Sequence, residues 1–407
     1  MSERRSIGIG MVGAGTMAGA HSHALRLVGA LYPELPLRPR LVAVADVNGQ
    51  LATQLAARFE YQRIEPDWRS LIEASDVDLV VACLPPVLNH EVVLAAAAAG
   101  RHLVSEKPLA ESAERGAELL RAARAAGVFH GLGAAYRWTP ALRTIRAMIE
   151  GGELGVIRSL RASFLLDYGA DPEVPLLWRF QRALAGGGIA IDTGYHVVDC
   201  ARFLVGEIDT VQAVTAIVIP ERPLPAAGAI GNRGAGTDSG GLRERGTVDV
   251  EDAAAALVTF AGGAYGVLET SRVTIGKRVA LEIDVFGSRG SASWNLEQPD
   301  EYRLCLPDEP TAFGYRRVLV SPAHPGAAQL LVAGTDGTGI GWLGQECAMW
   351  AEFVTAIAEG RQAHADFEDG VRINAVIDAV YAAARTGTRT AVVVPDLAAV
   401  RREVATA

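Results

Sequence analysis

The stretch "SIGIGMVGAGTMAGAHSHALRLVGAL", residues 6–31, decides the fold class. Its first ten residues are an apolar run typical of a buried strand, and residues 16–31 have the spacing of a helix. Gly13, Gly15 and Ala18 stand between the two in the pattern G-x-G-x-x-G/A. The first glycine permits a tight turn, the second lets a pyrophosphate approach the backbone, and the small third residue lets helix and strand pack closely. The loop therefore predicts a dinucleotide site at the start of the helix.

The second apolar strand, residues 41–47, has Asp46 at its end, and the carboxylate of Asp46 can accept hydrogen bonds from an adenosine ribose. Asp46 lies farther from the glycines than the usual ~20 residues, and the proline-rich segment 32–39 accounts for the excess. A solvated turn aspartate is the alternative interpretation. A carboxylate here would repel a 2′-phosphate, and the following Val47-Asn48 offers no arginine to bind one, so NAD is favoured over NADP.

Strands and helices alternate through the first third of the chain. Further strands are expected at 77–85, 102–108 and 128–136, and helices at 48–59 (capped by Asn48), 89–100 and 112–127. Short apolar strands separated by helices predict a parallel sheet covered on both faces, which is the doubly wound α/β class. We assign residues 1–133 to this Rossmann domain.

Beyond residue 133 the pattern changes. A helix at 139–151 precedes a long strand at 156–168, and further strands are expected at 210–221, 249–263, 264–274, 278–288 and 290–298. Glycine-rich turns between them predict consecutive antiparallel strands, with two helices at 345–359 and 369–385 covering one face. Residues 222–246, rich in glycine and poor in apolar side chains, are expected to form a mobile loop. Residues 134–407 would be a second, α/β domain.

Composition excludes several classes of protein. The chain has 407 residues, half of them apolar, which suits two globular domains, and its net charge of -9 argues against nucleic-acid or anionic-membrane partners. No apolar stretch is long enough to span a bilayer. The four cysteines are scattered without a CxxC, which indicates neither a disulfide scaffold nor a zinc site. We expect a cytoplasmic protein that binds a small molecule and no metal.

Two charged clusters suggest chemistry. Residues 101–110, "RHLVSEKPLA", begin as a buried strand and end in Glu106, Lys107 and Pro108, although an isolated Glu-Lys pair commonly marks a strand leaving the core. In residues 185–206, "AGGGIAIDTGYHVVDCARFLVG", Asp192, His196 and Asp199 have the spacing i, i+4, i+7 of one helix face. The three glycines before them let the chain pass close to a ligand. A lone helical histidine is more often structural, but this combination favours catalysis.

The chain resembles the Gfo/Idh/MocA oxidoreductases, which include glucose–fructose oxidoreductase and inositol dehydrogenases. The resemblance runs over essentially the whole chain, through "GAGTMAGAHSHAL", "LPPVLNHEVVLAAAAAGRHLVSEKPLA", "YRWTPALRTIRAMIEGGELG" and the 185–206 segment, in the family's order. A Glu-Lys-Pro element followed by D-x-x-x-H is highly specific for this family. The resemblance implies a Rossmann domain followed by an α/β domain with a large, mostly antiparallel open sheet that often pairs subunits into homodimers and homotetramers.

The resemblance also implies roles for these residues. Lys107 resembles the catalytic lysine at the carboxyl end of a strand, Pro108 would fix the turn through a cis bond, and Glu106 would lie nearer the nicotinamide. His196 resembles the general base for the substrate hydroxyl, and Lys107 and Asp192 would orient that hydroxyl and stabilise its developing charge. Whether Lys107 or His196 takes the proton first stays open.

Other positions match the family more weakly. Thr16 and Met17 follow the glycines, and Leu84, Pro85, Pro86, Asn89 and His90 match a loop beside the two riboses, although His90 could instead cap a helix. Tyr136 and Arg137 match a pair at the domain junction. Trp178 and Arg179 resemble a pair that approaches nicotinamide and substrate; alternatively, Trp178 belongs to the core and Arg179 pairs with an acid.

We therefore expect an NAD-dependent dehydrogenase that oxidises a secondary hydroxyl of a sugar, an anhydrosugar such as levoglucosan, or a cyclitol. Two alternatives stay open. An NAD-dependent glycosidase of the same fold would use transient oxidation and release an aglycone without net cofactor reduction. A non-catalytic sugar sensor would bind the dinucleotide only to regulate a partner, but the presence of Lys107, Asp192 and His196 together argues against it.

Overall fold

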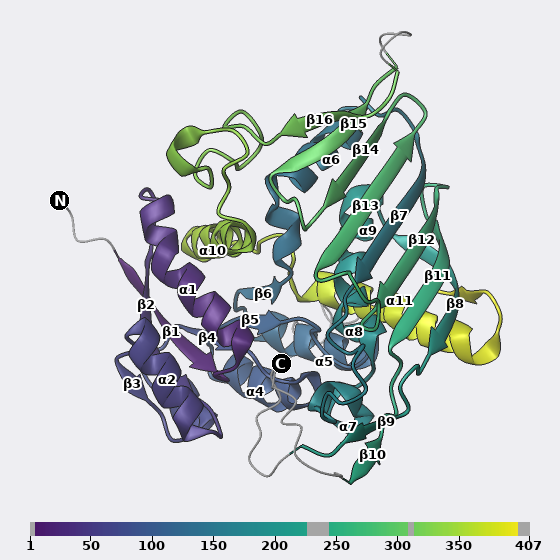
Figure 1. Ribbon diagram of the computed structural model, residues 1–407. Helices are drawn as coiled ribbons and strands as arrows, with labels where there is room; N and C mark the ends of the chain where they lie inside the picture. Colours follow the sequence, from purple (N-terminus) through teal and green to yellow (C-terminus); the bar gives the residue numbers. More distant parts are fainter. Residues whose placement is uncertain (1–4, 226–243, 308–312, 398–407) are drawn as a thin grey trace. The chain divides into compact units, whose positions relative to one another are not determined.

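The computed structural model describes residues 5–225, 244–307 and 313–397, which divide into two compact units (Figure 1). Within these ranges the first unit contains the chain up to Trp138, Ile340–Arg372 and the residues from Val394, and the second contains Thr139–Gly339 and Ile373–Val393. The predicted domain boundary at residue 133 lies near Trp138, where the chain first passes from one unit to the other. Residues 340–372, which the sequence places in the second domain, lie in the first unit.

A six-stranded parallel sheet forms the centre of the first unit, in the order β3-β2-β1-β4-β5-β6. Its strands are β1 (Ser6–Val12), β2 (Arg38–Ala45), β3 (Arg63–Ile64), β4 (Leu79–Ala82), β5 (His102–Glu106) and β6 (His130–Gly133). The strand order reverses between β1 and β4, the position at which doubly wound sheets bind ligands beyond their carboxyl ends. The doubly wound class is confirmed.

The helices of this unit lie close to their predicted positions. They are α1 (Thr16–Leu31), α2 (Gly49–Phe59), α3 (Trp68–Glu73), α4 (Pro86–Ala98), α5 (Ala113–Ala125) and α10 (Trp342–Glu359), with the 3-10 turn η1 (Ala135–Trp138). Asn48 caps α2 as expected, since its side chain accepts hydrogen bonds from the N–H groups of Gln50 and Leu51. The prediction that residues 345–359 cover the second sheet was wrong, because α10 packs against α1.

The second unit is built on a nine-stranded sheet in the order β16-β15-β14-β13-β7-β12-β11-β8-β17. The strands are β7 (Ile157–Leu165), β8 (Ile208–Ala216), β11 (Ala253–Phe260), β12 (Tyr265–Ser271), β13 (Ala280–Gly287), β14 (Ser291–Asn295), β15 (Glu301–Cys305), β16 (Arg316–Leu319) and β17 (Thr390–Ala391). The expected mostly antiparallel sheet is confirmed. However, β12 and β13 do not pair, because β7 lies between them, parallel to β12 and antiparallel to β13.

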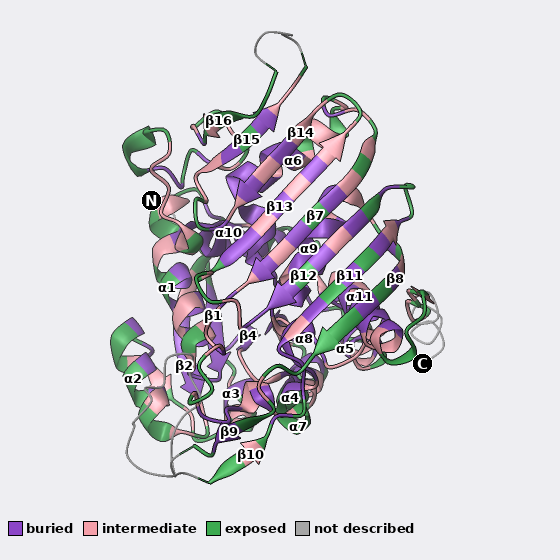
Figure 2. Ribbon diagram, turned by 45° about the vertical axis from the view of Figure 1, so that its right-hand side comes forward, coloured by how far each residue is buried: buried purple, intermediate pink, exposed green. Residues whose placement is uncertain are grey.

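Helices cover one face of this sheet. Its strands alternate buried and more exposed residues (Figure 2), and α9 (Gly194–Val205) packs on β7 and β12. The other helical elements of the unit are α6 (Pro140–Glu150), α7 (Arg182–Ala185), α8 (Ile189–Asp192) and the 3-10 turns η2 (Trp178–Phe180) and η4 (Val332–Gly334). Helix α11 (Phe367–Thr386) continues into this unit from Ile373.

The two ends of the predicted loop 222–246 form a short two-stranded sheet. Strand β9 (Glu221–Pro223) pairs antiparallel with β10 (Arg245–Thr247), and residues 226–243 between them lie outside the described residues. None of the four cysteines, all of which lie within the described ranges, forms a disulfide bond. Within the described ranges, no helix combines the length and apolar character needed to cross a membrane, and no group of His, Cys, Asp and Glu side chains is arranged to hold a metal ion.

Candidate active site

The glycine loop has the geometry that its sequence predicted. Gly13 has a φ of +95°, and a Cβ on it would lie 2.4 Å from the carbonyl oxygen of Cys83, so only glycine fits. A Cβ on Gly15 would meet no atom within 4 Å. Ala18 is fully buried, as close packing of the helix requires. No side chain caps the N-terminus of α1, so its amides and the open space over Gly15 suit a bound pyrophosphate.

Asp46 braces this loop. One carboxylate oxygen accepts a hydrogen bond from the Ala14 N–H at 2.7 Å, and the other accepts one from the Asn48 N–H at 2.7 Å. Each oxygen has a second lone pair, so the carboxylate can also accept a hydroxyl. Val47 beside it is fully exposed and carries no positive charge. Asp46 can therefore stabilise the turn and still accept a hydrogen bond from a ribose hydroxyl, so the two interpretations of this residue are compatible.

The Glu-Lys-Pro element lies at the carboxyl end of β5, as expected. The Lys107–Pro108 peptide bond is cis, which confirms that hypothesis. Glu106 is buried and contacts His21 of α1, while Lys107 is half-buried. Cys83, which follows β4, is half-buried as a residue. Burial of its thiol and the charges of Glu106 and Glu346 raise the pKa of that thiol, so it stays protonated.

The predicted ribose loop, Leu84 to His90, begins α4. Leu84 and Pro85 are half-buried and precede the helix. The amide nitrogen of Asn89 donates to the Ser105 Oγ at 2.6 Å and to the carbonyl of Leu109 at 3.1 Å, so Asn89 braces the turn after Lys107. His90 contacts the Glu118 carboxylate at 2.7 Å and caps no helix, because α4 begins at Pro86.

Tyr136 and Arg137 lie in η1 of the first unit and are both buried. The guanidinium of Arg137 donates to Asp369 at 2.8 Å, within the same unit. The carboxylate of Asp369 also accepts the N–H of Ala365. Arg137 thus helps to hold the segment that returns from the C-terminal part of the chain.

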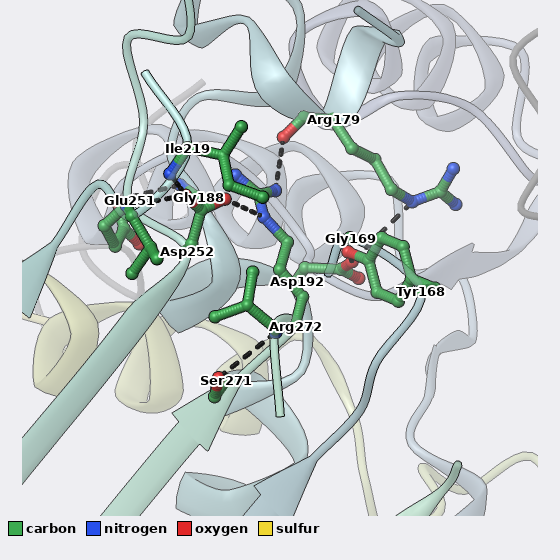
Figure 3. A network of polar contacts seen from close by, with 12 residues as sticks. Tyr168, Gly169, Arg179, Gly188, Asp192, Ile219, Glu251, Asp252, Ser271 and Arg272 are labelled. Carbon is green, nitrogen blue, oxygen red and sulfur yellow. Dashed lines mark hydrogen bonds and ion pairs between the residues drawn. The ribbon is translucent and has the colours of Figure 1, made fainter. Parts of the chain in front are cut away.

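In the second unit, Asp192 lies at the centre of a group of polar side chains (Figure 3). The Tyr168 hydroxyl donates to its carboxylate at 3.3 Å, and Arg179 Nε lies 3.6 Å from the same oxygen. Arg179 also stacks over the ring of its neighbour Trp178 at 4.2 Å. Arg179 thus pairs with an acid, as the alternative interpretation held, but that acid is the predicted catalytic aspartate. Tyr168 was missed, because nothing in the sequence spacing connects it with Asp192.

His196 follows Asp192 along the chain in the next helix. Asp192 ends α8, Thr193 has helical backbone angles, and His196 lies in the first turn of α9 with its ring 5.9 Å from that of Phe164. The predicted helical stripe is therefore nearly continuous. Asp199, the third member, is buried and belongs to the packing of α9.

Two glycines of the run, Gly187 and Gly188, pack closely against the protein itself. A Cβ on Gly187 would lie 2.2 Å from the Tyr381 hydroxyl, and one on Gly188 would lie 2.2 Å from the carbonyl of Glu251. The Glu251 carboxylate accepts the N–H groups of Gly188 and Ala190, and the Tyr381 hydroxyl donates to it at 2.9 Å. Glu251 and Tyr381 thereby anchor the start of the segment that carries Asp192.

A group of buried charged and aromatic side chains supports the turn that carries Arg179. Fully buried Arg272 contacts Asp252 at 2.7 Å and donates to the carbonyl of Arg179 at 2.8 Å (Figure 3). The guanidinium groups of Arg272 and Arg222 both lie over the ring of Phe180, at 4.3 and 4.0 Å. Such cation–π contacts strengthen when they are desolvated. Sequence inspection missed this group, because its members are far apart in the chain.

Two family models match the chain. The model described as an oxidoreductase family with an NAD-binding Rossmann fold matches residues 7–133, and that of the GFO/IDH/MocA C-terminal domain matches residues 142–293. Together they match each unit in part, from residue 7 to residue 293 with a gap at 134–141.

Individual proteins match over most of the chain. A levoglucosan dehydrogenase from Pseudarthrobacter phenanthrenivorans is 36% identical over 377 residues, which is 92% of this chain and 95% of its own length. An inositol 2-dehydrogenase from Acidothermus cellulolyticus is 30% identical over 308 residues, 75% of this chain and 77% of its own. A solved structure of levoglucosan dehydrogenase in complex with NADH and levoglucosan is similar with a TM-score of 0.88 and 34% identity, covering 96% of this chain and 100% of that one.

Proposed function

Because the chain belongs to the Gfo/Idh/MocA family of oxidoreductases, with an NAD-binding Rossmann domain, we propose that it is an NAD-dependent dehydrogenase of a sugar, anhydrosugar or cyclitol. It would oxidise a secondary hydroxyl to a ketone. The observation that carries the proposal is the 36% identity to a levoglucosan dehydrogenase across 92% of the chain. Levoglucosan is therefore the first substrate to test.

Each part of the proposed reaction is assigned to a particular chemical group. NAD, when bound, supplies the acceptor for the hydride that leaves the substrate carbon. We assign His196 as the general base for the hydroxyl proton, since the pKa of an imidazole is ordinarily near neutral. Lys107 would donate a hydrogen bond to the same oxygen and stabilise its developing negative charge. Asp192, held by Tyr168 and Arg179, would orient the hydroxyl.

NAD is the proposed cofactor, in preference to NADP. The Asp46 carboxylate is fixed by two backbone N–H groups beside the glycine loop, where it would repel a 2′-phosphate. Val47 next to it is exposed and uncharged, so no cation balances that repulsion there. Reduction of NAD at a rate well above that of NADP, measured with the same substrate, would support this assignment.

The decisive experiment is to follow nicotinamide absorbance with NAD and a panel of levoglucosan, inositols, glucosides and aldoses. We expect reduction with one class of polyol. Lys107→Ala should then lower kcat by about 10²–10⁴-fold while NAD binding by calorimetry stays close to the parent value. Lys277→Ala is the matched control, since Lys277 is a partly exposed lysine paired with Glu282 in the second unit. Undiminished turnover of Lys107→Ala would overturn the assignment of Lys107.

The proposal extends to assembly and location. The face of the nine-stranded sheet opposite α9 exposes Val214, Leu257 and Tyr265, and an apolar surface of this kind suits pairing into a homodimer or homotetramer. Light scattering of the parent and of Leu257→Lys would test this, since a lysine there should weaken the dimer. Four cysteines without a disulfide bond among them suit a reducing cytoplasm, where we expect the enzyme to act.

A further inference from the structure

A buried cluster of charged groups lies inside the first unit, beneath the end of β5. His21 of α1 is fully buried, and its Nε2 lies 2.8 Å from Glu106 Oε1. Its Nδ1 lies 3.4 Å from Glu346 Oε2 and 3.1 Å from Trp350 Nε1, both on α10. We call these four residues the His21 cluster. It joins β5, α1 and α10, and the two helices lie side by side in Figure 1.

The protonation of the cluster follows from the chemistry of its members. An indole N–H can only donate, so Nδ1 accepts from Trp350 when His21 is neutral, and Nε2–H then donates to Glu106. When Glu346 is ionised, a proton on Nδ1 can instead face its carboxylate. Burial and the charge of Glu106 raise the pKa of Glu346 to about 7, against the opposing effect of His21. In both arrangements Nε2 donates to Glu106, so that contact persists.

Further charged or titratable groups act on the cluster. Burial lowers the pKa of His21, but the hydrogen bond to Glu106 and the charges of Glu346 and Glu106 outweigh it, so the net shift is upward. Burial raises the pKa of the thiols of Cys83 and Cys347; the charge of Glu346 adds to the shift in both, and that of Glu106 in Cys83. They stay neutral and do not compete for the proton.

Glu106 connects the cluster with Lys107. Glu106 Oε2 accepts the backbone N–H of Lys107 at 3.1 Å, while Oε1 contacts His21. Gly133 on the adjacent strand β6 leaves room for this carboxylate, since a Cβ on Gly133 would lie 2.6 Å from Oε1. One carboxylate is therefore held by the imidazole on one side and holds the lysine backbone on the other.

We propose that His21 is a positioning residue for Lys107, acting through Glu106; this rests on the dehydrogenase function proposed above. The reason is geometric. His21 belongs to the helix that begins at the glycine loop, so one rigid element fixes both the pyrophosphate site and the backbone of the lysine. Small displacements of a catalytic group are costly, because a misplacement of ~1 Å can lower a rate about 10²-fold.

The test compares two amide substitutions of similar polarity. His21→Asn keeps a polar group near the position of Nδ1 but is too short to reach Glu106, whereas His21→Gln can extend its amide N–H to Glu106. Tyr61→Phe is the control, since it removes another buried hydrogen bond to α1, the one between Tyr61 and Ser22, and leaves the contact of His21 with Glu106 in place. For each variant, kcat, KM for NAD and substrate, calorimetric NAD affinity and the thermal midpoint are measured.

We expect His21→Asn to lower kcat by about tenfold to a hundredfold with NAD affinity nearly unchanged, and His21→Gln to recover most of the loss. Tyr61→Phe should lower the thermal midpoint without lowering kcat. If kcat of folded His21→Asn equals that of the parent, or if kcat follows the thermal midpoint across all three variants, the inference is overturned.

A measurement without turnover separates this inference from the proposed function. Hydrogen exchange of the Lys107 amide should be faster in His21→Asn than in His21→Gln, because that amide loses a fixed acceptor. If the parent reduces NAD with no polyol while this difference is present, the dehydrogenase proposal fails and the restraint on Lys107 stands. Equal exchange in the two variants would contradict the restraint itself.

Discussion

Each unit buries a cluster of opposite charges beneath its candidate catalytic residues, but the two clusters are neutralised differently. In the first unit, Glu106 and Glu346 face the imidazole of His21. In the second, Asp252 faces the guanidinium of Arg272, and both are fully buried. An imidazole loses its charge near neutral pH, whereas a guanidinium keeps it at every pH that a protein survives.

The two clusters also act in a similar way on the backbone. Glu106 accepts the N–H of Lys107, and Arg272 donates to the carbonyl of Arg179, which in turn contacts Asp192. In both units a buried charge thus holds a peptide group next to a proposed functional side chain. The comparison teaches that the stability of the first unit should depend on pH through its buried cluster, whereas the contribution of the Asp252–Arg272 pair should not.

The largest effect on stability is expected for the Asp252–Arg272 pair, because a guanidinium stays charged at every pH that a protein survives. Arg272→Met leaves Asp252 buried without its cation, and breaking such a pair costs about 3–5 kcal/mol of unfolding free energy. Urea unfolding measures this loss. Arg303→Met, at an exposed arginine on β15, should change the unfolding free energy by less than about 0.5 kcal/mol. A similar small change for Arg272→Met would contradict the view that this pair supports the second unit.

A smaller, pH-dependent effect is expected in the first unit. The pKa of Glu346 is raised in the folded protein to about 7, so the folded state binds this proton more tightly than the unfolded chain. The stabilisation of the folded state by this proton is fully present below the ordinary carboxyl pKa and is lost as the pH rises through about 7. The loss amounts to roughly 1–3 kcal/mol of unfolding free energy. The upward shift in the pKa of His21 acts in the same direction.

Unfolding at about pH 6 and about pH 8 measures this dependence. Glu346→Gln should flatten it, because the amide cannot ionise. If the unfolding free energy of the parent were the same at both pH values, the expected difference between the two clusters would be contradicted. An undiminished dependence in Glu346→Gln would assign it to other groups.

The glycines of the two units give a further contrast. Gly188→Ala places a Cβ against the backbone of Glu251, so we expect a loss of about 1–3 kcal/mol in unfolding free energy. Because Gly188 precedes the Asp192 segment, the kcat should fall as well. Thermal unfolding and turnover measure the two effects, and a stable, fully active Gly188→Ala would show that this packing is not required.

Gly15→Ala should have the smallest effect on stability. Its φ of -78° suits alanine and no atom lies within 4 Å of the new Cβ, so the thermal midpoint should stay at the parent value. NAD binding should weaken by about tenfold, roughly 1.4 kcal/mol, because the methyl group occupies the approach of the pyrophosphate. Unchanged NAD affinity by calorimetry would place the pyrophosphate elsewhere.

Much of the first unit could be predicted because its signals are local. The strand, the glycine loop and α1 lie within 26 consecutive residues, and the predicted bounds of α1 agree with Thr16–Leu31. Six strands of the second sheet, β7, β8 and β11 to β14, were predicted, whereas β15, β16 and β17 were not. The strand order was not predicted either, because pairing of β7 with both β12 and β13 depends on contacts more than 90 residues apart. The return of α10 to the first unit escaped prediction for the same reason.

The resemblance to the family implied the cis-proline turn after Lys107, which the structure contains. The amino-acid sequence by itself determined the doubly wound class, the glycine loop and the placement of Asp192 and His196 on adjacent helical turns. These follow from local spacing and backbone chemistry. Tertiary structure alone decided which side chains surround them: Tyr168 and Arg179 against Asp192, Glu251 and Tyr381 against the glycine run, and His21 and α10 beneath Glu106. Such contacts depend on how distant segments pack, and the positions of charges in a buried interior are not encoded in any single segment.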